Sequence, residues 1–186
     1  MKFLIVGLGN IGSEYDGTRH NIGFDIADVL TMKYEGKFAP DRLADMAQFK
    51  YKGRTIVVIK PTTYMNLSGK AVKYWMDKEK TPIENVLVLV DEIALPLGTV
   101  RMKGSGSDGG HNGLKSIQDV LQTAKYPRLR FGVGNDFPKG RQVEHVLGKW
   151  NADEMPILKE KIPKAVEMIE SFVFQGIQRT MNNYNE

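Results

Sequence analysis

The stretch of residues 86–115, V-L-V-L-V-D-E-I-A-L-P-L-G-T-V-R-M-K-G-S-G-S-D-G-G-H-N-G-L-K, constrains the fold more than any other part of the chain. Its first five residues are an unbroken apolar run, which is typical of a central parallel strand covered on both faces. Asp91 and Glu92 follow at once, and residues 104–110 are all Gly, Ser or Asp. Alone, Asp91 is more simply explained as a solvated loop carboxylate. Because ligands in open α/β sheets bind beyond the carboxyl ends of the strands, its basic and glycine-rich neighbourhood favours a site there.

The pattern of apolar residues divides the rest of the chain into strands and helices. We expect strands at residues 2–8, 43–51, 55–60, 99–103 and 129–133, and a further short strand at residues 143–147. We expect helices to begin near residue 19, to include residues 71–76, to follow Asn112 as an N-cap, and to occupy residues 153–178 with a bend at Pro163. This order predicts an α/β fold: a single domain, residues 1–186, in which helices flank a twisted, mixed and mostly parallel β-sheet.

Composition excludes several kinds of site and segment. The chain has no cysteine, which excludes disulfides, thiolate nucleophiles and cysteine-ligated metals. Its N-terminal apolar run is broken by Gly7 and Gly9 and has no small-residue cleavage site, and no apolar stretch reaches membrane length. We therefore expect a cytoplasmic protein without membrane contact, and we expect a monomer.

Basic residues are concentrated in residues 101–150. This segment contains nine Lys or Arg and four Asp or Glu, so its net charge is +5, against +4 for the whole chain. Such a segment indicates an anionic partner such as nucleic acid. A solvated positive face without a partner explains the charge equally well.

His20 and Asp91 are candidates for acid–base chemistry. His20 lies beyond the end of the first expected strand, and Asp91 ends the strand that begins at Val86. If these strands are neighbours, both side chains emerge at the same edge of the sheet. A carboxylate beside a histidine fixes its tautomer and favours the imidazolium that forms when the ring accepts a proton. From spacing alone, two surface groups that never meet remain the alternative.

The sequence offers no obvious covalent nucleophile, because it lacks both cysteine and the G-x-S-x-G motif. Water activated by His20 is the more economical proposal. The three histidines lack metal-ligand spacing, so we expect neither a metal nor another cofactor. Asn10, Asn66 and Asn112 each follow a strand or open a helix, where an amide can stabilise an oxyanion, and we expect Asn66 or Asn112 to do so in this reaction. Asparagine is also common in turns and caps, and that explanation is favoured for each one separately.

Gly7, Gly9 and Gly12 match the spacing of a dinucleotide-binding fingerprint and would suit a nucleotide-dependent oxidoreductase. That motif requires a helix to open on its last glycine and an acidic residue about 20 positions later. Here Gly12 leads into a turn-rich segment, and the sequence near position 30 indicates the end of a helix. The nucleotide interpretation is weak.

Together these motifs resemble the bacterial peptidyl-tRNA hydrolase family. The resembling blocks are G-L-G-N-x-G-x-E-Y-x-x-T-R-H-N at residues 7–21, K-P-T-T-Y-M-N-L-S-G at 60–69, D-E-x-x-L-P-x-G at 91–98, G-G-H-N-G at 109–113, R-L-R-F-G-V-G at 128–134 and V-L-G at 146–148. They follow the family's order and spacing over most of the chain. Two departures are Ile11, where proline is common, and Asp108 beside the expected tRNA path.

The resemblance implies an esterase that cleaves the bond between a peptide, or an N-blocked amino acid, and the terminal ribose of tRNA. Such an enzyme recycles tRNA from stalled translation and needs no metal. The residue matching His20 activates water, and the one matching Asp91 orients and stabilises the histidine. The position of Asn10 is associated with distinguishing blocked from free aminoacyl groups. The remaining substrate-contacting positions correspond to Tyr15, Tyr64, Met65, Asn66 and Asn112.

The basic segment supplies candidates for salt-sensitive contacts with tRNA phosphates: Arg101, Lys103, Arg128, Arg130, Lys139 and Arg141. One rival hypothesis is an RNA-binding module on the same fold that has lost hydrolysis. The joint presence of His20, Asp91 and the three asparagines disfavours it. A purely structural protein would leave these clustered polar residues without a reason.

Overall fold

A computed structural model describes residues 1–185 of the chain, and within them seven strands form one mixed sheet in the order β2-β3-β4-β1-β5-β7-β6. The strands are β1 (Lys2–Gly7), β2 (Ala39–Asp41), β3 (Ala44–Tyr51), β4 (Arg54–Pro61), β5 (Val86–Glu92), β6 (Val100–Lys103) and β7 (Arg128–Gly132). The central strands β4, β1, β5 and β7 run parallel to one another. The outer strands β3, β2 and β6 pair antiparallel.

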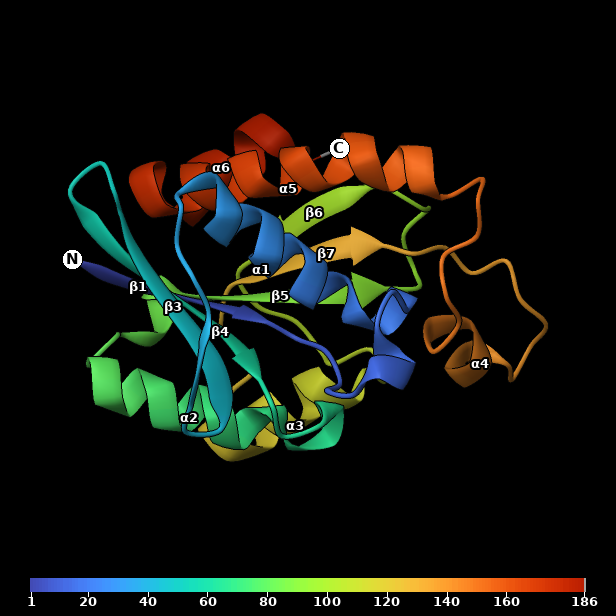
Figure 1. Ribbon diagram of the computed structural model, residues 1–186, viewed down its shortest axis with the longest axis horizontal. Helices are drawn as coiled ribbons and strands as arrows, with labels where there is room; N and C mark the ends of the chain where they lie inside the picture. The colour runs from blue at the N-terminus through green and yellow to red at the C-terminus, as the bar shows by residue number, and fades with distance from the viewer. Residues whose placement is uncertain (186) are drawn as a thin grey trace.

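Helices cover both faces of the sheet (Figure 1). On one face lie α1 (Ile22–Lys33), α5 (Met155–Gln175) and α6 (Ile177–Tyr184), and on the other lie α2 (Ser68–Glu79) and α3 (Asn112–Leu121). A short helix, α4 (Gln142–Val146), lies beyond the sheet, beside the turns that precede α1. Four 3-10 turns complete the elements: η1 (Ser13–Tyr15), η2 (Arg19–Asn21), η3 (Met65–Leu67) and η4 (Ile83–Asn85).

The central strands are buried on both sides. In β1, Phe3 and Ile5 belong to one core cluster and Leu4 and Val6 to the other, because successive side chains of a strand point to opposite faces. The same division explains why these strands are unbroken apolar runs in the sequence. The predicted α/β fold, with its mixed sheet between helices, is confirmed.

The arrangement of β1 and β5 positions the candidate site. The two strands are parallel neighbours, and Gly7 at the end of β1 pairs with Leu89 in β5. The loops that follow both strands therefore begin at the same edge of the sheet. His20 and Asp91 are brought to that edge, as we expected if these strands were neighbours.

Several local predictions were wrong. Residues 143–147 do not form a strand but largely belong to α4, whose Val143 and Val146, together with Leu147 at its end, line a cavity. The long C-terminal helix ends at Gly176, whose φ of 90° is incompatible with a helix, and α6 begins after it. The three-residue strand β2 gives no recognisable pattern and was not predicted. No helix within residues 1–185 has the length and apolar character needed to cross a bilayer.

Candidate active site

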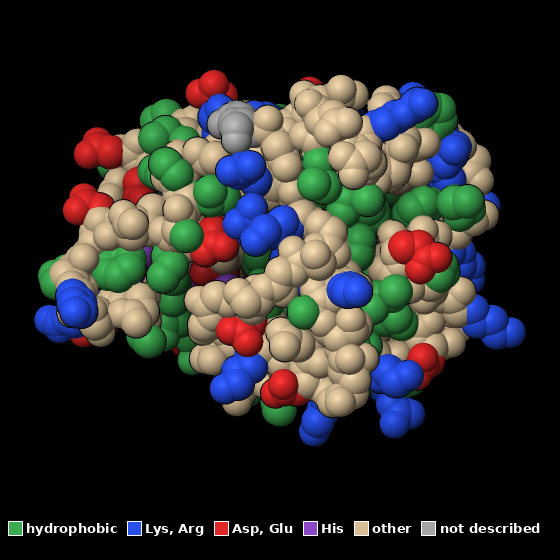
Figure 2. All heavy atoms as spheres, turned by 180° about the vertical axis from the view of Figure 1, so that it is seen from behind, with side chains coloured by type: hydrophobic (Ala, Val, Ile, Leu, Met, Phe, Trp, Pro, Cys, Tyr) green, Lys and Arg blue, Asp and Glu red, His purple; other side chains and the backbone are tan. Residues whose placement is uncertain are grey.

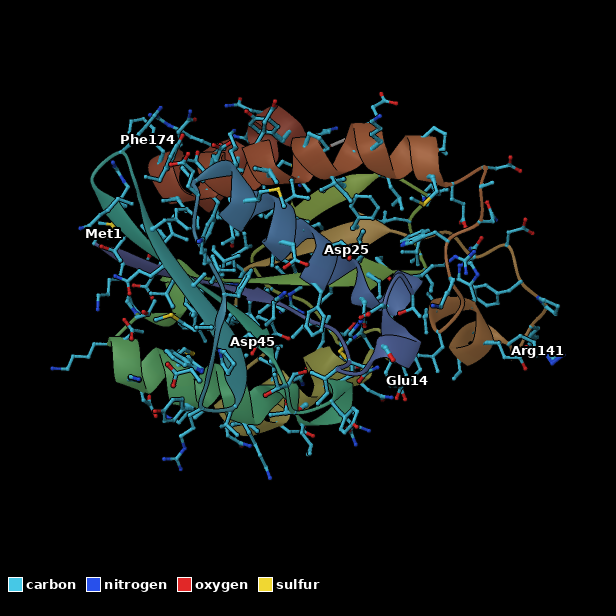
Figure 3. All side chains as sticks on the ribbon, in the orientation of Figure 1. Met1, Glu14, Asp25, Asp45, Arg141 and Phe174 are labelled. Atoms are coloured by element: carbon cyan, nitrogen blue, oxygen red, sulfur yellow. The ribbon has the colours of Figure 1, made fainter. Side chains whose placement is uncertain are left out.

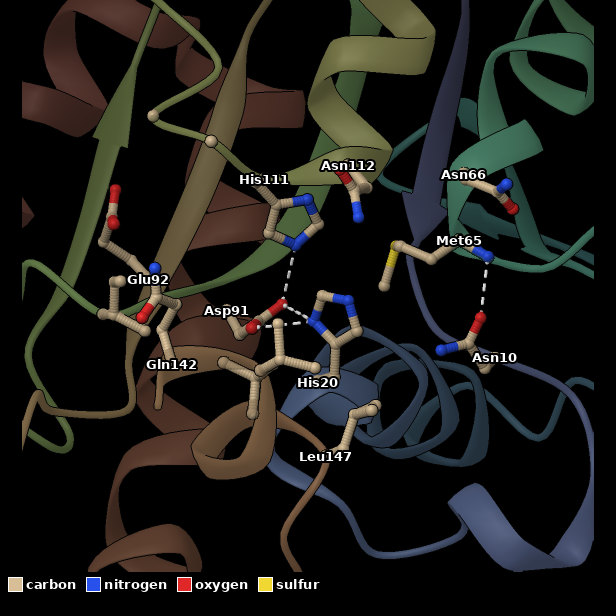
Figure 4. Close-up of a pocket in the computed structure, with 15 residues that line it drawn as sticks. Asn10, His20, Met65, Asn66, Asp91, Glu92, His111, Asn112, Gln142 and Leu147 are labelled. Atoms are coloured by element: carbon tan, nitrogen blue, oxygen red, sulfur yellow. Dashed lines mark hydrogen bonds and ion pairs between the residues drawn. The ribbon is translucent and has the colours of Figure 1, made fainter. Parts of the chain in front are cut away.

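A cavity of about 380 Å³ opens where the carboxyl ends of β1 and β5 meet. It is lined by residues from the loop after β1, from η2 and η3, from the end of β5, from the glycine loop before α3, and from α4 (Figure 4). Among them are the predicted site residues Asn10, His20, Met65, Asn66, Asp91 and Asn112. Six predicted residues from five separate segments therefore converge on one cavity.

His20 and Asp91 are in direct contact. The Nδ1 atom of His20 lies 3.0 Å from Oδ1 and 2.9 Å from Oδ2 of Asp91. The Asp91 side chain is only 2% exposed, and that of His20 is 12% exposed. A buried carboxylate accepts hydrogen bonds, so Nδ1 of His20 carries a proton and Nε2 has a free lone pair. In Figure 4 this second ring nitrogen faces the open part of the cavity.

His111 is a third member of this cluster, and its position in the sequence did not predict this contact. Its Nε2 atom donates to Oδ1 of Asp91 at 2.8 Å. Its Nδ1 atom accepts from the backbone N–H groups of Gly113 at 3.1 Å and Leu114 at 3.4 Å, so the His111 side chain caps α3. The N-cap is therefore His111 and not Asn112, which is the first residue of the helix. The two cap bonds fix His111 in the neutral Nε2–H tautomer.

Asp91 is held as an anion by the two rings. Burial alone raises the pKa of the Asp91 carboxyl, but electrostatic attraction and hydrogen bonds from the N–H groups of His111 and His20 outweigh burial, and the pKa lies below its ordinary range. The two imidazole rings lie 4.9 Å apart, centroid to centroid. Asp91 thus remains charged at neutral pH and can stabilise a proton on His20.

The cluster has the composition of a metal site, since one ligand atom each from His20, Asp91 and His111 lies within 4.8 Å of the others. Its hydrogen bonding does not suit a metal. His111 already uses the lone pair of Nδ1 for two backbone N–H groups. Coordination through Nε2 would require the ring to lose its remaining proton and become an imidazolate. The donor set fits a hydrogen-bonded triad better than a cation.

Asn10 presents an amide N–H to the cavity. Its Oδ1 atom accepts from the backbone N–H of Met65 at 2.7 Å, which directs its amide nitrogen toward the side where His20 lies (Figure 4). The backbone of Asn10 is itself held by Asn21, which accepts from the Asn10 N–H at 2.8 Å and donates to the Asn10 carbonyl at 2.9 Å. Asn21 is buried beside the cavity wall, and no sequence pattern singled it out.

The other predicted substrate residues are divided by the structure. Asn66 and Asn112 are exposed and line the cavity, and Met65 is buried in its wall. Tyr15 in η1 and Tyr64 before η3 are not among the lining residues. Tyr64 is 49% exposed and has a φ of 61° and a ψ of 156°, a backbone conformation that non-glycine residues rarely adopt. Such strain is typical of functional loops. Tyr64 directly precedes Met65, which lines the cavity.

Arg128 differs from the other predicted basic contacts. It is 1% exposed, and its guanidinium donates to the backbone carbonyls of Gly106, Ala124 and Tyr126 while lying 4.0 Å from the Tyr126 ring centroid. Burial lowers the pKa of Arg128, partly offset by Tyr126. Arg128 thus holds the glycine loop in place through its hydrogen bond to the Gly106 carbonyl. We therefore leave Arg128 out of the proposed phosphate contacts.

Arg101 and Arg130 form the centre of the remaining basic patch. They face each other directly across the antiparallel β6–β7 pair, and Lys103 follows on the same face. The Nε atoms of both arginines are buried without a hydrogen-bond partner among the described residues. The Nη1 atom of Arg130 lies 3.6 Å from Oε1 of Glu92, a residue that lines the cavity. Like charges directly opposite destabilise a sheet, so this pair is suited to an anion.

Figure 2 shows Lys and Arg side chains beside a hollow in which acidic and histidine side chains are visible. Lys139 and Arg141 are exposed in the loop before α4, and Arg141 projects outward there while forming an ion pair with Glu144 (Figure 3). The basic residues therefore occupy two separate segments, the β6–β7 pair beside Glu92 and the loop before α4, instead of one continuous stripe.

Comparison with known proteins identifies the family. The family model described as peptidyl-tRNA hydrolase matches residues 4–186. The chain belongs to the peptidyl-tRNA hydrolase family. It is 52% identical to a peptidyl-tRNA hydrolase of Parabacteroides distasonis and 54% identical to one of Porphyromonas gingivalis, covering all of this chain and at least 99% of each relative. The crystal structure of peptidyl-tRNA hydrolase from Acinetobacter baumannii matches with a TM-score of 0.92 and 34% identity, over 98% of this chain and 94% of that one.

Membership of the peptidyl-tRNA hydrolase family establishes this chain as an enzyme of the hydrolase class. The predicted resemblance is confirmed over nearly the whole length. The candidate active site of this hydrolase is the cavity at the sheet edge, which is lined by His20, Asp91 and His111.

Proposed function

We propose that the protein hydrolyses the ester bond between the peptide, or an N-blocked amino acid, and tRNA, and so recycles tRNA from stalled or aborted translation. The observation that carries the proposal is the contact between Nδ1 of His20 and Asp91, which leaves Nε2 of His20 facing the cavity. A ring nitrogen with a free lone pair beside a buried anion is the arrangement that a general base requires.

In the proposed mechanism, a water molecule bound to Nε2 of His20 attacks the ester carbonyl carbon and gives its proton to that nitrogen. Asp91 stabilises the imidazolium that forms. The tetrahedral intermediate then collapses, the bond from carbon to the ribose oxygen breaks, and the imidazolium returns the proton to the departing oxygen. A positioned base of this kind contributes roughly 10²- to 10⁴-fold in rate.

Amide groups around the cavity are the candidates for stabilising the negative oxygen. Asn10 and Asn112 both direct an amide toward the space beside His20 (Figure 4). The orientation of Asn10 is set by its bond to Met65, so its amide nitrogen can only donate into the cavity. Loss of one such donor reduces the rate by roughly 10²- to 10³-fold in acyl-transfer enzymes.

We propose that Arg101, Lys103 and Arg130 on the β6–β7 pair bind tRNA phosphates and that Lys139 and Arg141, in the loop before α4, contribute further phosphate contacts. The unpartnered Nε atoms of Arg101 and Arg130 support this assignment. A phosphate oxygen between them would satisfy buried donors and relieve the repulsion between two like charges. Contacts of this kind do not depend on nucleotide sequence and weaken with salt.

The experiment that tests the function measures release of an N-blocked amino acid from tRNA, with a chelator present throughout. It compares the wild type with His20→Ala, and uses unblocked aminoacyl-tRNA as the control substrate. We expect cleavage of the blocked substrate only, and its loss in a folded His20→Ala variant. Near-normal turnover by that variant would exclude His20 as the base.

The rival function is binding of RNA without hydrolysis. A wild-type protein that binds tRNA but releases no amino acid from the blocked substrate would support this rival and contradict the hydrolase mechanism.

A further inference from the structure

Arg19 directly precedes His20 in η2, yet its side chain does not enter the cavity. Its guanidinium pairs with Glu154, with Nη2 2.7 Å from Oε1 and Nε 3.4 Å from Oε2. The Nη1 atom donates to the backbone carbonyl of His145 at 3.1 Å. The same guanidinium lies 5.5 Å from the ring centroid of Trp150. All of these partners belong to one segment, residues 145–154, which includes the end of α4 and the chain that follows it.

Backbone contacts join the same two segments. The N–H of Arg19 donates to the carbonyl of Gly148 at 3.0 Å, and Thr18 forms an isolated β-bridge with Lys149. A Cβ atom at Gly148 would lie 2.7 Å from Nη1 of Arg19 and 3.2 Å from the carbonyl oxygens of Glu144 and His145, so a side chain there would displace the guanidinium. The turn that carries His20 is therefore attached to the end of α4 through both backbone and side chain.

The two attached segments form different walls of the cavity. His20 lies in one wall, and Gln142, Val143, Val146 and Leu147 form the wall contributed by α4 and its last residue. In Figure 1, α4 lies outside the main sheet, beside the turns before α1. Within the described residues α4 belongs to neither core cluster. Its position relative to His20 thus depends on a few specific contacts more than on core packing.

From these contacts we infer that Arg19 and Glu154 are a positioning pair that fixes the wall formed by α4 relative to His20. The inference rests on the proposed function, because it assigns the pair an effect on substrate hydrolysis. Arg19 touches neither the cavity nor a reacting atom, and it acts through the segment it holds. The ion pair is nearly buried, with the Arg19 and Glu154 side chains 11% and 12% exposed. Buried ion pairs often contribute little net stability, and their geometry can instead specify one arrangement.

The test uses Glu154→Gln, which removes the charge but keeps an oxygen that can accept from the N–H of Asn151, as Glu154 does at 2.9 Å. Arg19→Lys is the second variant, since it keeps the charge but cannot reach both Glu154 and the His145 carbonyl with a planar fork. The matched control is Glu170→Gln. The Glu170 side chain is also 12% exposed and pairs with Lys33 at 2.9 Å, but it lies between α1 and α5, away from the cavity.

Three quantities are measured for each variant: kcat and KM with an N-blocked aminoacyl-tRNA, the thermal midpoint, and amide hydrogen exchange of residues 142–147. We expect Glu154→Gln to raise KM roughly tenfold with a smaller change in kcat, because displacement of a cavity wall by about 1 Å is enough for such an effect. Exchange in residues 142–147 should accelerate. Arg19→Lys should show a smaller change in the same direction. Glu170→Gln should lower the thermal midpoint comparably and leave kcat, KM and this exchange unchanged.

Unchanged KM, kcat and exchange in both Glu154→Gln and Arg19→Lys would overturn the inference and leave the pair with a purely structural role. Equal changes in KM in Glu154→Gln and Glu170→Gln would also overturn it, since the effect would then follow from general destabilisation. If the wild type itself hydrolyses no substrate, the proposed function fails, and hydrogen exchange alone decides whether the pair positions α4.

Discussion

Replacement of Asp91 by asparagine provides a sharp test of the hydrogen-bond network around His20. In the native protein, Oδ1 of Asp91 lies 2.8 Å from Nε2 of His111, and Oδ2 lies 2.9 Å from Nδ1 of His20. His111 can only donate through Nε2, because its Nδ1 accepts the cap bonds of α3. The amide oxygen of the introduced asparagine must therefore take the place of Oδ1. Its NH₂ group must then face Nδ1 of His20.

This orientation favours the wrong tautomer of His20. The NH₂ group would lie 2.9 Å from Nδ1, and the amide oxygen 3.0 Å from it. Donation from the NH₂ group to Nδ1 shifts the ring proton toward Nε2, and the lone pair needed for catalysis is then lost. The variant also loses the charge-assisted hydrogen bond, worth about 1.5–3 kcal/mol, and the anion that stabilises the imidazolium. Together these effects raise the barrier by about 3–5 kcal/mol, or roughly 10²- to 10⁴-fold in kcat.

A second substitution tests the tautomer argument separately from the loss of charge. His111→Asn keeps an N-cap residue at the start of α3 but removes the donor that fixes the amide introduced by Asp91→Asn. In the double variant Asp91→Asn/His111→Asn, that amide can rotate and present its oxygen to Nδ1 of His20. We expect kcat of the double variant to exceed that of Asp91→Asn by roughly tenfold, measured with an N-blocked aminoacyl-tRNA under single turnover. A double variant no faster than Asp91→Asn, or an Asp91→Asn variant with nearly native kcat, would refute the reasoning.

Three further predictions concern other parts of the molecule. Burial first, and then Asp28 and Asp16, raise the pKa of Asp25 to about 7, partly offset by Lys60. The pKa of Asp25 in the folded protein exceeds the unfolded value of about 4, so its ionisation destabilises the fold as pH rises from 4 to 7. Asp25→Asn should therefore raise the free energy of unfolding by about 1–3 kcal/mol at pH 8 and by almost nothing at pH 4. Equal gains in denaturant titrations at both pH values would contradict this. Asn21→Ala should reduce kcat/KM roughly tenfold or more, because the backbone that orients Asn10 loses both hydrogen bonds; unchanged kinetics in a folded variant would argue against that support. Replacing Lys103 or Arg130 with Gln should raise KM and lower the slope of log KM against log salt by about 1, and a native slope would remove that residue from the phosphate contacts.

The central pair of the site could be predicted from the sequence because its placement follows from topology. A buried apolar run predicts a central strand, and adjacent parallel strands bring the residues after them to one edge. Once β1 and β5 are neighbours, His20 lies beside Asp91. The amphipathic patterns of α1, α2, α3 and α5 were equally informative, because each helix buries one face against the sheet.

The remaining features depend on contacts that spacing does not encode. The path of the glycine loop decides that His111 both caps α3 and reaches Asp91. In V-E-H-V-L, apolar residues at both ends suit either a strand or a helix. Among the described residues, no strand of the sheet is available to pair with this segment, and its spacing in the sequence does not reveal this. Arg128 and Arg130 lie on the same face of β7, yet Arg128 is fully buried, with its guanidinium bonded to Gly106 of the glycine loop, whereas 14% of the Arg130 side chain is exposed.

The position of the proton on the His20 ring decides whether this residue can activate water, and ¹⁵N NMR of the ring nitrogens at neutral pH measures it. The chain has only three histidines, so His20→Ala and His111→Asn suffice to assign the signals. We predict that His20 carries its proton on Nδ1 with a bare Nε2, whereas His111 carries its proton on Nε2. A proton on Nε2 of neutral His20, with Nδ1 bare, would contradict the assignment of His20 as the base that activates water.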